Sequence, residues 1–209
     1  MADFKFEQDL FKRGLRFIAG VDEVGRGALF GPVVAAAVIL PERLILDSRA
    51  GWTKEINDSK LLSPANRQRL ARRIWEEAAS VGIGYASNVE VDQKNIYWAS
   101  FAAMKRAVEN MALTPDILLV DGFALKGVDY AQMGIPQGDR KSTSIAAASI
   151  VAKVFRDEMM VSLDQVYHGY HLGKNKGYGT REHYQALDEL GPTSLHRLTF
   201  NLKLRTLGK

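Results

Sequence analysis

Two adjacent carboxylates, Asp22 and Glu23, follow an apolar segment that ends at Val21, and the turn Gly25-Arg26-Gly27 comes almost directly after them. Strand interiors disfavour Asp, and a buried carboxylate is costly unless something pairs with it. Two neighbouring carboxylates also repel each other, which a divalent cation would relieve. The glycines let backbone N–H groups approach a ligand, and the guanidinium of Arg26 suits a phosphate. This combination indicates metal-dependent phosphoryl chemistry.

Two further acids stand at the ends of predicted elements. Asp121 follows the apolar run 117–120, and Asp139 follows a loop. Ligands of open α/β sheets lie near the carboxyl ends of strands, so Asp121 should emerge beside Asp22 if their strands are neighbours. An all-carboxylate set suits Mg²⁺ or Mn²⁺ and argues against zinc. Two such ions about 3.5–4 Å apart could activate a water and stabilise a leaving 3′-oxygen.

The carboxylate set leaves two questions open. Asp139 precedes Arg140-Lys141-Ser142, where an acid could simply cap the next helix, and Asp157 within that helix is its rival as the fourth ligand. In addition, successive strand residues point to opposite faces, so Asp22 and Glu23 cannot both face one metal from an ideal strand. Either the strand becomes irregular at Glu23, or Glu23 acts through its longer side chain.

The elements that must position these residues follow from the apolar pattern and from turn signals. Ser63-Pro64 is a typical helix start, with an N-cap and a first-turn proline. We expect strands over 16–23, 32–40, 81–86 and 117–120, and helices over 4–13, 65–80, 91–111, 142–163 and 180–190. Segment 43–62 is expected to be irregular, and a loop should join 122 to 138. The prediction is an α/β fold whose mixed central sheet is flanked by helices, with a main domain over 1–165 and a small helical C-terminal appendage over 166–209.

Composition sets the broad class. The chain has 209 residues, a formal net charge of +4 and no cysteine, which excludes disulfides and thiolate metal sites. No apolar run approaches the roughly 18 residues that span a bilayer, and the N-terminus lacks a signal-peptide pattern. We therefore expect a cytoplasmic monomer that does not bind membranes.

The last third combines tyrosines with basic residues, an arrangement that can follow a nucleic-acid backbone. The members are Tyr167, Tyr170, Tyr178, Tyr184, Lys174, Lys176 and Arg181. A solvated appendage with core tyrosines explains them equally well, except for Tyr178. Lys60 precedes the helix start at Ser63-Pro64, where an anion is favoured, and is predicted to contact a phosphate, although a polar loop that caps the helix explains it almost equally well.

Other motifs are set aside. Gly25–Gly31 comes close to a dinucleotide fingerprint, but its spacing is one residue too long and a strand follows it. His168 and His171 lack the partners of a tetrahedral metal site and are expected on a surface loop. Lys141, Ser142 and Thr143 begin a helix and could bind an anion or merely cap it.

Taken in order, several motifs resemble those of bacterial ribonuclease HII. They are Gly20–Gly27, Gly31–Val38, Asp58-Ser59-Lys60, Val120-Asp121-Gly122, Gly138-Asp139 with Ser144–Val154, Lys176–Thr180, and Gly191-Pro192 followed by His196-Arg197. The similarity covers roughly residues 16–200. Each motif alone is weak evidence, whereas the ordered set is specific. Ala28, Phe30, Phe123–Lys126 and Arg140-Lys141 depart from the family's pattern without removing a candidate ligand.

The resemblance implies an RNase H-like fold and endonucleolytic cleavage of the RNA strand of RNA–DNA hybrids. It also implies incision at ribonucleotides embedded in duplex DNA, leaving 5′-phosphate and 3′-hydroxyl ends. The implied metal ligands are Asp22, Glu23, Asp121 and Asp139, and the implied sensor of the ribose 2′-hydroxyl is Gly25, Arg26 and Gly27. Tyr178 would stack on the sugar of the following deoxynucleotide. Another carboxylate-metal nuclease or integrase, or a hybrid-binding protein without catalysis, remain as alternatives.

Overall fold

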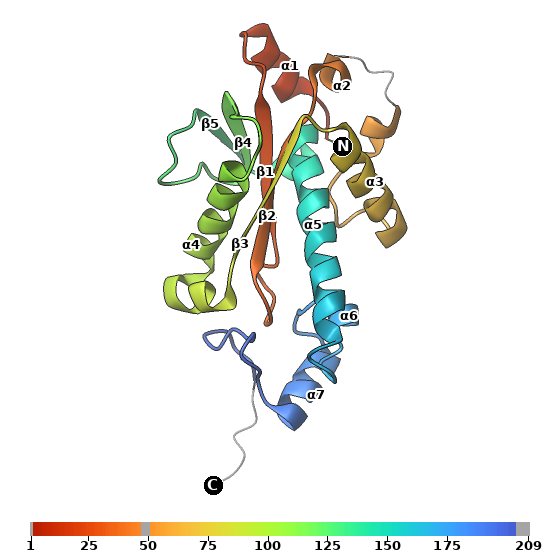
Figure 1. The fold of residues 1–209 in the computed structure, drawn as a ribbon, viewed down its shortest axis with the longest axis vertical. Coiled ribbons are helices and arrows are strands. Elements are labelled where there is room, and N and C mark those ends of the chain that lie inside the picture. The colour runs from red at the N-terminus through yellow and green to blue at the C-terminus, as the bar shows by residue number, and fades with distance from the viewer. Residues whose placement is uncertain (1, 47–50, 204–209) are drawn as a thin grey trace.

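A five-stranded mixed sheet forms the centre of the computed structural model, which describes residues 2–46 and 51–203 (Figure 1). The strand order is β3-β2-β1-β4-β5. Strands β1, β2 and β3 pair antiparallel, whereas β1, β4 and β5 pair parallel. The strand bounds are β1 Ile18–Val24, β2 Val33–Ile39, β3 Ser80–Ala86, β4 Ile117–Asp121 and β5 Gln132–Ile135. The predicted α/β class with a mixed sheet is confirmed.

Two long helices cover the two faces of this sheet. Helix α5 (Thr143–Asp164) packs on one face and α4 (Asn88–Glu109) on the other, so the sheet separates two apolar clusters (Figure 1). Small residues let α5 lie close to β1: a Cβ added at Gly20 would collide with the backbone of Ser144. The alanine-rich sequence of α5 therefore serves close helix–sheet packing.

Several local expectations need correction. Segment 43–62, expected to be irregular, contains most of α2 (Glu42–Leu46) and a 3₁₀ helix (Gly51–Glu55), and the expected 122–138 loop contains β5. Residues 47–50 lie outside the described part. Helix α4 begins at Asn88 rather than at 91, because Ser87 and Glu90 form a capping box, and it is interrupted at Asn95. The start of α3 (Pro64–Glu77) is confirmed, since Ser63 Oγ accepts the N–H of Asn66 at 3.3 Å. Helix α1 (Lys5–Lys12) matches the first predicted helix.

The C-terminal segment contains α6 (Leu172–Asn175) and α7 (Arg181–Leu190) beyond the end of the sheet at which β1 and β2 are joined (Figure 1). It has its own apolar cluster, which takes Leu29 and Phe30 from the β1–β2 connection and Met160 from α5. The division into 1–165 and 166–209 stays a prediction. Among the described residues, no helix combines the length and apolar character that a membrane crossing requires.

Candidate active site

Parallel pairing of β1 and β4 brings the first two predicted carboxylates together. The register pairs Ile18 with Ile117 and ends with Val21 beside Val120. Asp22 and Asp121 occupy the next position on their respective strands. The two acids therefore emerge side by side at the carboxyl ends of neighbouring strands, as their sequence context predicts.

These acids line a cavity of about 580 Å³. Every predicted site residue lies on its wall, together with four residues that were not predicted. The wall consists of Asp22, Glu23, Val24, Gly25, Arg26, Gly27, Ser59, Lys60, Asp121, Asp139, Ser149, Lys153 and Tyr178. Segments more than 150 positions apart in the chain thus meet at one place.

Asp22 is the most deeply buried of the four acids. Its carboxylate accepts the N–H of Glu23 at 2.8 Å and a hydrogen bond from Ser149. Burial raises the pKa of Asp22 well above its ordinary value, and the negative charges of Glu23 and Asp121 raise it further. A nearby cation would offset this repulsion.

Glu23 reaches the cavity through its longer side chain. The strand does not become irregular there, because Glu23 still pairs with Ala35 and Val24 with Val34. The Glu23 side chain is only 7% exposed and its Oε1 accepts from Arg26 Nη1 at 2.8 Å. Burial raises the pKa of Glu23 although Arg26 opposes the shift. The other oxygen, Oε2, is buried without a hydrogen-bond partner among the described residues.

A short 3₁₀ turn, Gly138–Arg140, carries Asp139 to the same wall. The N–H of Gly138 donates to Oδ1 of Asp121 at 2.6 Å, which ties this turn to the end of β4. Burial raises the pKa of Asp139, and the charges of Asp121 and Asp58 add to the shift. Asp139 does not cap α5, since that position belongs to Ser142, whose Oγ accepts from Ile145 N–H at 3.3 Å. Capping is thus the role of Ser142 here.

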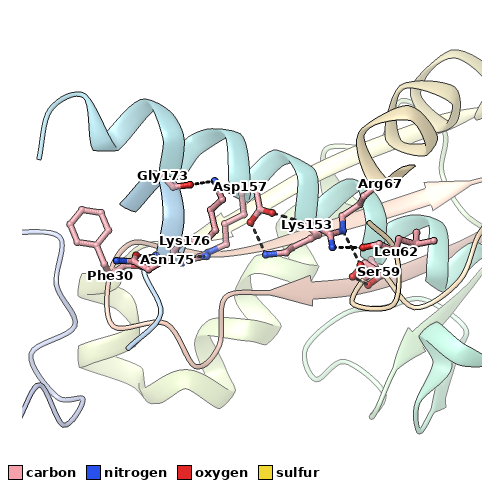
Figure 2. A network of polar contacts seen from close by, with 12 residues as sticks. Phe30, Ser59, Leu62, Arg67, Lys153, Asp157, Gly173, Asn175 and Lys176 are labelled. Carbon is pink, nitrogen blue, oxygen red and sulfur yellow. Dashed lines mark hydrogen bonds and ion pairs between the residues drawn. The ribbon is translucent and has the colours of Figure 1, made fainter. Parts of the chain in front are cut away.

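Asp157, the rival for the fourth position, does not line the carboxylate cavity. Figure 2 shows its carboxylate between Lys153 and Arg67, with Nζ of Lys153 at 2.6 Å and Nη1 of Arg67 at 3.6 Å. It borders a separate cavity of about 260 Å³. Of the two alternatives, the structure brings only Asp139 to the other acids.

The buried side chain of Arg156 lies directly against Gly25 of the Gly25-Arg26-Gly27 turn. Gly25 has φ +89°, and a Cβ there would collide with Nε of Arg156, so this position requires glycine. The fully buried Arg156 donates to the carbonyls of Phe30, Pro32 and Lys176 at 3.0, 3.1 and 2.7 Å. The Arg26 side chain itself is 52% exposed and faces the cavity.

Lys60 is exposed at the cavity wall and is supported by Asp58. Oδ1 of the buried Asp58 accepts the N–H of Lys60 at 3.0 Å, and its Oδ2 accepts from Nε and Nη2 of Arg140 at 3.1 and 3.0 Å. Asp58 therefore ties the Lys60 loop to the turn that carries Asp139. Arg140, which departs from the family's pattern, has a structural partner.

The C-terminal aromatic residues divide into one cavity residue and several packing residues. Tyr178 lines the cavity, and the cationic groups of Lys153 and Arg156 lie 5.8 and 5.4 Å from its ring centre. Tyr170 is buried and donates to the carbonyl of Gly191 at 2.6 Å, and Tyr167 packs edge-on against Phe30. His168 and His171 are exposed, as expected of a surface loop.

Sequence reasoning missed Val24, Ser59, Ser149 and Lys153 as cavity residues. Ser149 and Lys153 are four positions apart, which places them on one face of a helix. That spacing was the available signal for these two residues. Ser59 Oγ lies 3.0 Å from Ser149 Oγ, so the loop before α3 is connected to α5 beneath the acids.

The carboxylate oxygens line the cavity but do not point toward one common position. Within residues 2–46 and 51–203, no three acidic or histidine side chains are arranged so that they could hold a metal ion as they stand. Glu23 is turned toward Arg26 and Asp121 toward Gly138. Binding of an ion would therefore require these carboxylates to rotate.

Comparison with known proteins gives one family. The family model described as ribonuclease HII matches residues 19–203. Ribonuclease HII of Lactobacillus delbrueckii subsp. bulgaricus is 51% identical over 198 residues, covering 95% of this chain and 74% of that protein. Ribonuclease HII of Moorella thermoacetica is also 51% identical, over 94% of this chain and 92% of its own length.

Solved structures show the same fold. Ribonuclease HII in the PCNA:RNase HII complex from Archaeoglobus fulgidus matches with a TM-score of 0.70 and 24% identity, covering 91% of this chain and 98% of that chain. Bst-RNase HIII in complex with Mn²⁺ matches with a TM-score of 0.64 and 21% identity, covering 90% and 68% of the two chains. The RNase H-like fold is confirmed, and the extent and identity of the sequence matches show that the chain belongs to the ribonuclease HII family.

Proposed function

We propose that the carboxylate cavity hydrolyses the RNA strand of RNA–DNA hybrids and incises duplex DNA at single embedded ribonucleotides, leaving 5′-phosphate and 3′-hydroxyl ends. The observation that carries this proposal is the adjacency of Asp22 and Asp121 at the ends of two parallel strands. Glu23 and Asp139 complete a set of acids in the same cavity. A protein that only binds hybrids would have no need to bury acids that repel each other and the phosphates of the ligand.

The donor set fits hard divalent cations. It consists of oxygen atoms, its charges oppose one another, and Oε2 of Glu23 is buried without a hydrogen-bond partner in the described part of the chain. Asp22, Glu23, Asp121 and Asp139 would hold Mg²⁺ or Mn²⁺, and the complex of Bst-RNase HIII with Mn²⁺ supports the use of a divalent cation. When bound, such ions activate an attacking water and neutralise the leaving 3′-oxygen.

The remaining cavity residues select and orient the substrate. The turn Gly25-Arg26-Gly27, in which Arg26 and Gly27 are exposed, reads the 2′-hydroxyl, the group that distinguishes RNA from DNA. Tyr178 requires the adjoining sugar to fit against its ring. Lys60 presents its ammonium group to the phosphates. Because these contacts address ribose and backbone, we expect little preference for base sequence.

A duplex that carries one ribonucleotide, compared with an all-DNA duplex of the same sequence, tests the proposal. We expect cleavage of the first and not the second, in Mg²⁺ and in Mn²⁺ assayed separately. Equal cleavage of both would favour another carboxylate-metal nuclease. The Asp121→Asn variant should lose metal-dependent cleavage, and full activity of this variant would remove the acids from the mechanism.

Metal binding can be measured without turnover. Calorimetric titration with Mn²⁺ should show binding to the wild-type protein and much weaker binding to Asp22→Asn. Asp157→Asn is a matched control on α5, because Asp157 borders the other cavity. Its Mn²⁺ affinity should stay much closer to that of the wild type than the affinity of Asp22→Asn does.

A further inference from the structure

Two histidines of the C-terminal segment meet in the interior. His183, in the first turn of α7, and His196, in the segment after it, are 0% and 1% exposed. Their Nε2 atoms lie 3.1 Å apart. The rings of Tyr170 and Phe30 pack against His196, and Tyr170 also packs against His183. Neither histidine lines the carboxylate cavity.

The hydrogen bonds at the two ends of this pair define its tautomers. The backbone N–H of Thr193 donates to Nδ1 of His196 at 2.9 Å, so the proton of His196 is on Nε2. That proton is donated to Nε2 of His183, which must therefore carry its own proton on Nδ1. Nδ1 of His183 donates to the backbone carbonyl of Tyr178 at 3.0 Å. Two neutral imidazoles thus connect Thr193 to Tyr178.

The next residue, Arg197, makes hydrogen bonds to the Gly25-Arg26-Gly27 turn and to the residues that follow it. Its Nη1 donates to the carbonyl of Arg26 at 2.8 Å and its Nε to that of Gly31 at 3.0 Å. Its own N–H donates to the carbonyl of Leu29 at 2.8 Å. His196 is therefore connected to Tyr178 through His183, and the next residue, Arg197, is connected to the Gly25-Arg26-Gly27 turn.

Stability alone is a poor explanation for this arrangement. Arg197 is fully buried, Asp92 attracts its positive charge, and its Nη2 has no hydrogen-bond partner among the described residues. Burial lowers the pKa of Arg197 to about 9. Apolar residues of similar volume often stabilise a core more than buried ionic groups do, so stability alone does not account for a buried Arg197 with one unpartnered nitrogen.

We propose that His183, His196 and Arg197 are positioning residues, which hold Tyr178 and the Gly25-Arg26-Gly27 turn at the separation that admits a ribonucleotide followed by a deoxynucleotide. The proposal rests on the roles given above to the turn and to Tyr178. Reading one hydroxyl group requires groups placed within about 0.5 Å, and a displacement of 1 Å can cost about a hundredfold in rate. Direct hydrogen bonds to the backbone of both reading elements supply such placement.

Two variants of nearly equal size separate the hydrogen bond from simple packing. His183→Leu removes the donor to Tyr178, whereas the amide of His183→Asn can still supply one. On a duplex with one embedded ribonucleotide, we expect His183→Leu to lower kcat at least about tenfold, with KM changed less than about twofold. His183→Asn should recover most of the loss. On a full RNA–DNA hybrid the loss should be smaller, because no deoxynucleotide follows the cleaved bond.

A double-mutant cycle with Tyr178→Ala tests whether His183 acts through Tyr178. If it does, His183→Leu should cost little further activity once Tyr178 is truncated. A simple loss of folded protein would instead lower cleavage of both substrates equally and add to the effect of Tyr178→Ala. That additive, substrate-independent result would overturn the proposal.

A measurement on the wild-type protein covers the case in which His183→Leu does not fold. Nitrogen-15 NMR of labelled histidines should show His183 protonated on Nδ1 and His196 on Nε2, both neutral near pH 7. Reversed tautomers, or a charged ring, would contradict the connection to Tyr178. Failure of the proposed function has a different signature: the wild-type protein would then cut an all-DNA duplex as well as one containing a ribonucleotide.

Discussion

Arg26 donates to Glu23 at 2.8 Å, so the turn proposed to read the ribose is bonded to a carboxylate proposed to hold metal. The Arg26 side chain is half-exposed and the Glu23 side chain is nearly buried. Ion pairs with an exposed member contribute about 0–1 kcal/mol to stability, so this pair matters mainly for the charge state of Glu23. If both proposed roles hold, this hydrogen bond couples substrate recognition to metal binding.

Replacing Arg26 should shift the acid limb of activity. Burial raises the pKa of Glu23 and Arg26 opposes that shift, so in Arg26→Ala the pKa of Glu23 rises further. Glu23 is then protonated at a higher pH, and the acid limb of kcat/KM should move to higher pH in an assay between about pH 5 and pH 8. Arg26→Lys keeps the positive charge and should shift the limb less. An unchanged limb in Arg26→Ala would show that Glu23 is not the group that titrates.

Removing a charge from the carboxylate cluster should stabilise the metal-free protein. The pKa of Asp22 is raised by burial and by repulsion, so the charged form costs folding free energy near neutral pH. In excess chelator, Asp22→Asn should therefore melt above the wild type, and a gain of about 1 kcal/mol corresponds to about 2–4 °C. Asp121→Asn should not melt below the wild type, because an amide oxygen can still accept from Gly138.

Added Mg²⁺ provides the control for both variants. It should raise the melting temperature of the wild type and have a smaller effect on either variant, since binding to the folded state stabilises it. A metal-free Asp22→Asn protein that melts several degrees lower would indicate that hydrogen bonds to Asp22 outweigh its repulsion.

Two glycines of one turn should respond differently to alanine. Gly25 has φ +89° and no room for a Cβ beside Arg156, so Gly25→Ala should lower the free energy of unfolding by about 1–3 kcal/mol or more. A Cβ at Gly27 meets nothing within 4 Å and its backbone is not left-handed. Gly27→Ala should fold normally and lose activity only because the methyl group enters the reading surface.

Urea unfolding and cleavage of a ribonucleotide-containing duplex measure the two effects separately. The distinction fails if Gly27→Ala is as unstable as Gly25→Ala. It also fails if Gly25→Ala unfolds at the same urea concentration as the wild type.

Local signals were sufficient for much of the fold. The Ser63-Pro64 start predicted α3, and apolar runs that end in Asp predicted β1 and β4. The capping box of α4, Ser87 with Glu90, was also present in the sequence and would have set the helix start correctly. Strand β5 (Gln132–Ile135) has no alternating pattern, because it is a short edge strand that is only partly buried.

The site was predictable where chemistry and element ends coincide, as at Asp22 and Asp121. Individual side-chain contacts between distant segments were not predictable. The clamp between Asp58 and Arg140 joins residues 82 positions apart, and Arg197 reaches Arg26 across 171 positions. Such contacts depend on the fold, and no local pattern encodes them.

The buried histidine pair predicts a specific dependence of stability on pH. Burial and the neighbouring His183 lower the pKa of His196 to about 4, and burial with the charge of His171 lowers that of His183. A histidine whose pKa is lowered by folding takes up its proton first in the unfolded chain. Its contribution to the free energy of unfolding is therefore complete above pH 6.5 and is lost as the pH falls toward about 4.

For His196 this loss of folding stability amounts to a few kcal/mol. Urea unfolding at about pH 7, 6 and 5 should show this loss as a decline in the free energy of unfolding that is smaller in His196→Gln, which keeps only His183. The raised carboxyl pKa values of Asp22 and Glu23 act in the opposite direction in both proteins, so the difference between the two curves isolates His196. A difference that stays constant over this range would mean that the pair already carries a proton in the folded protein.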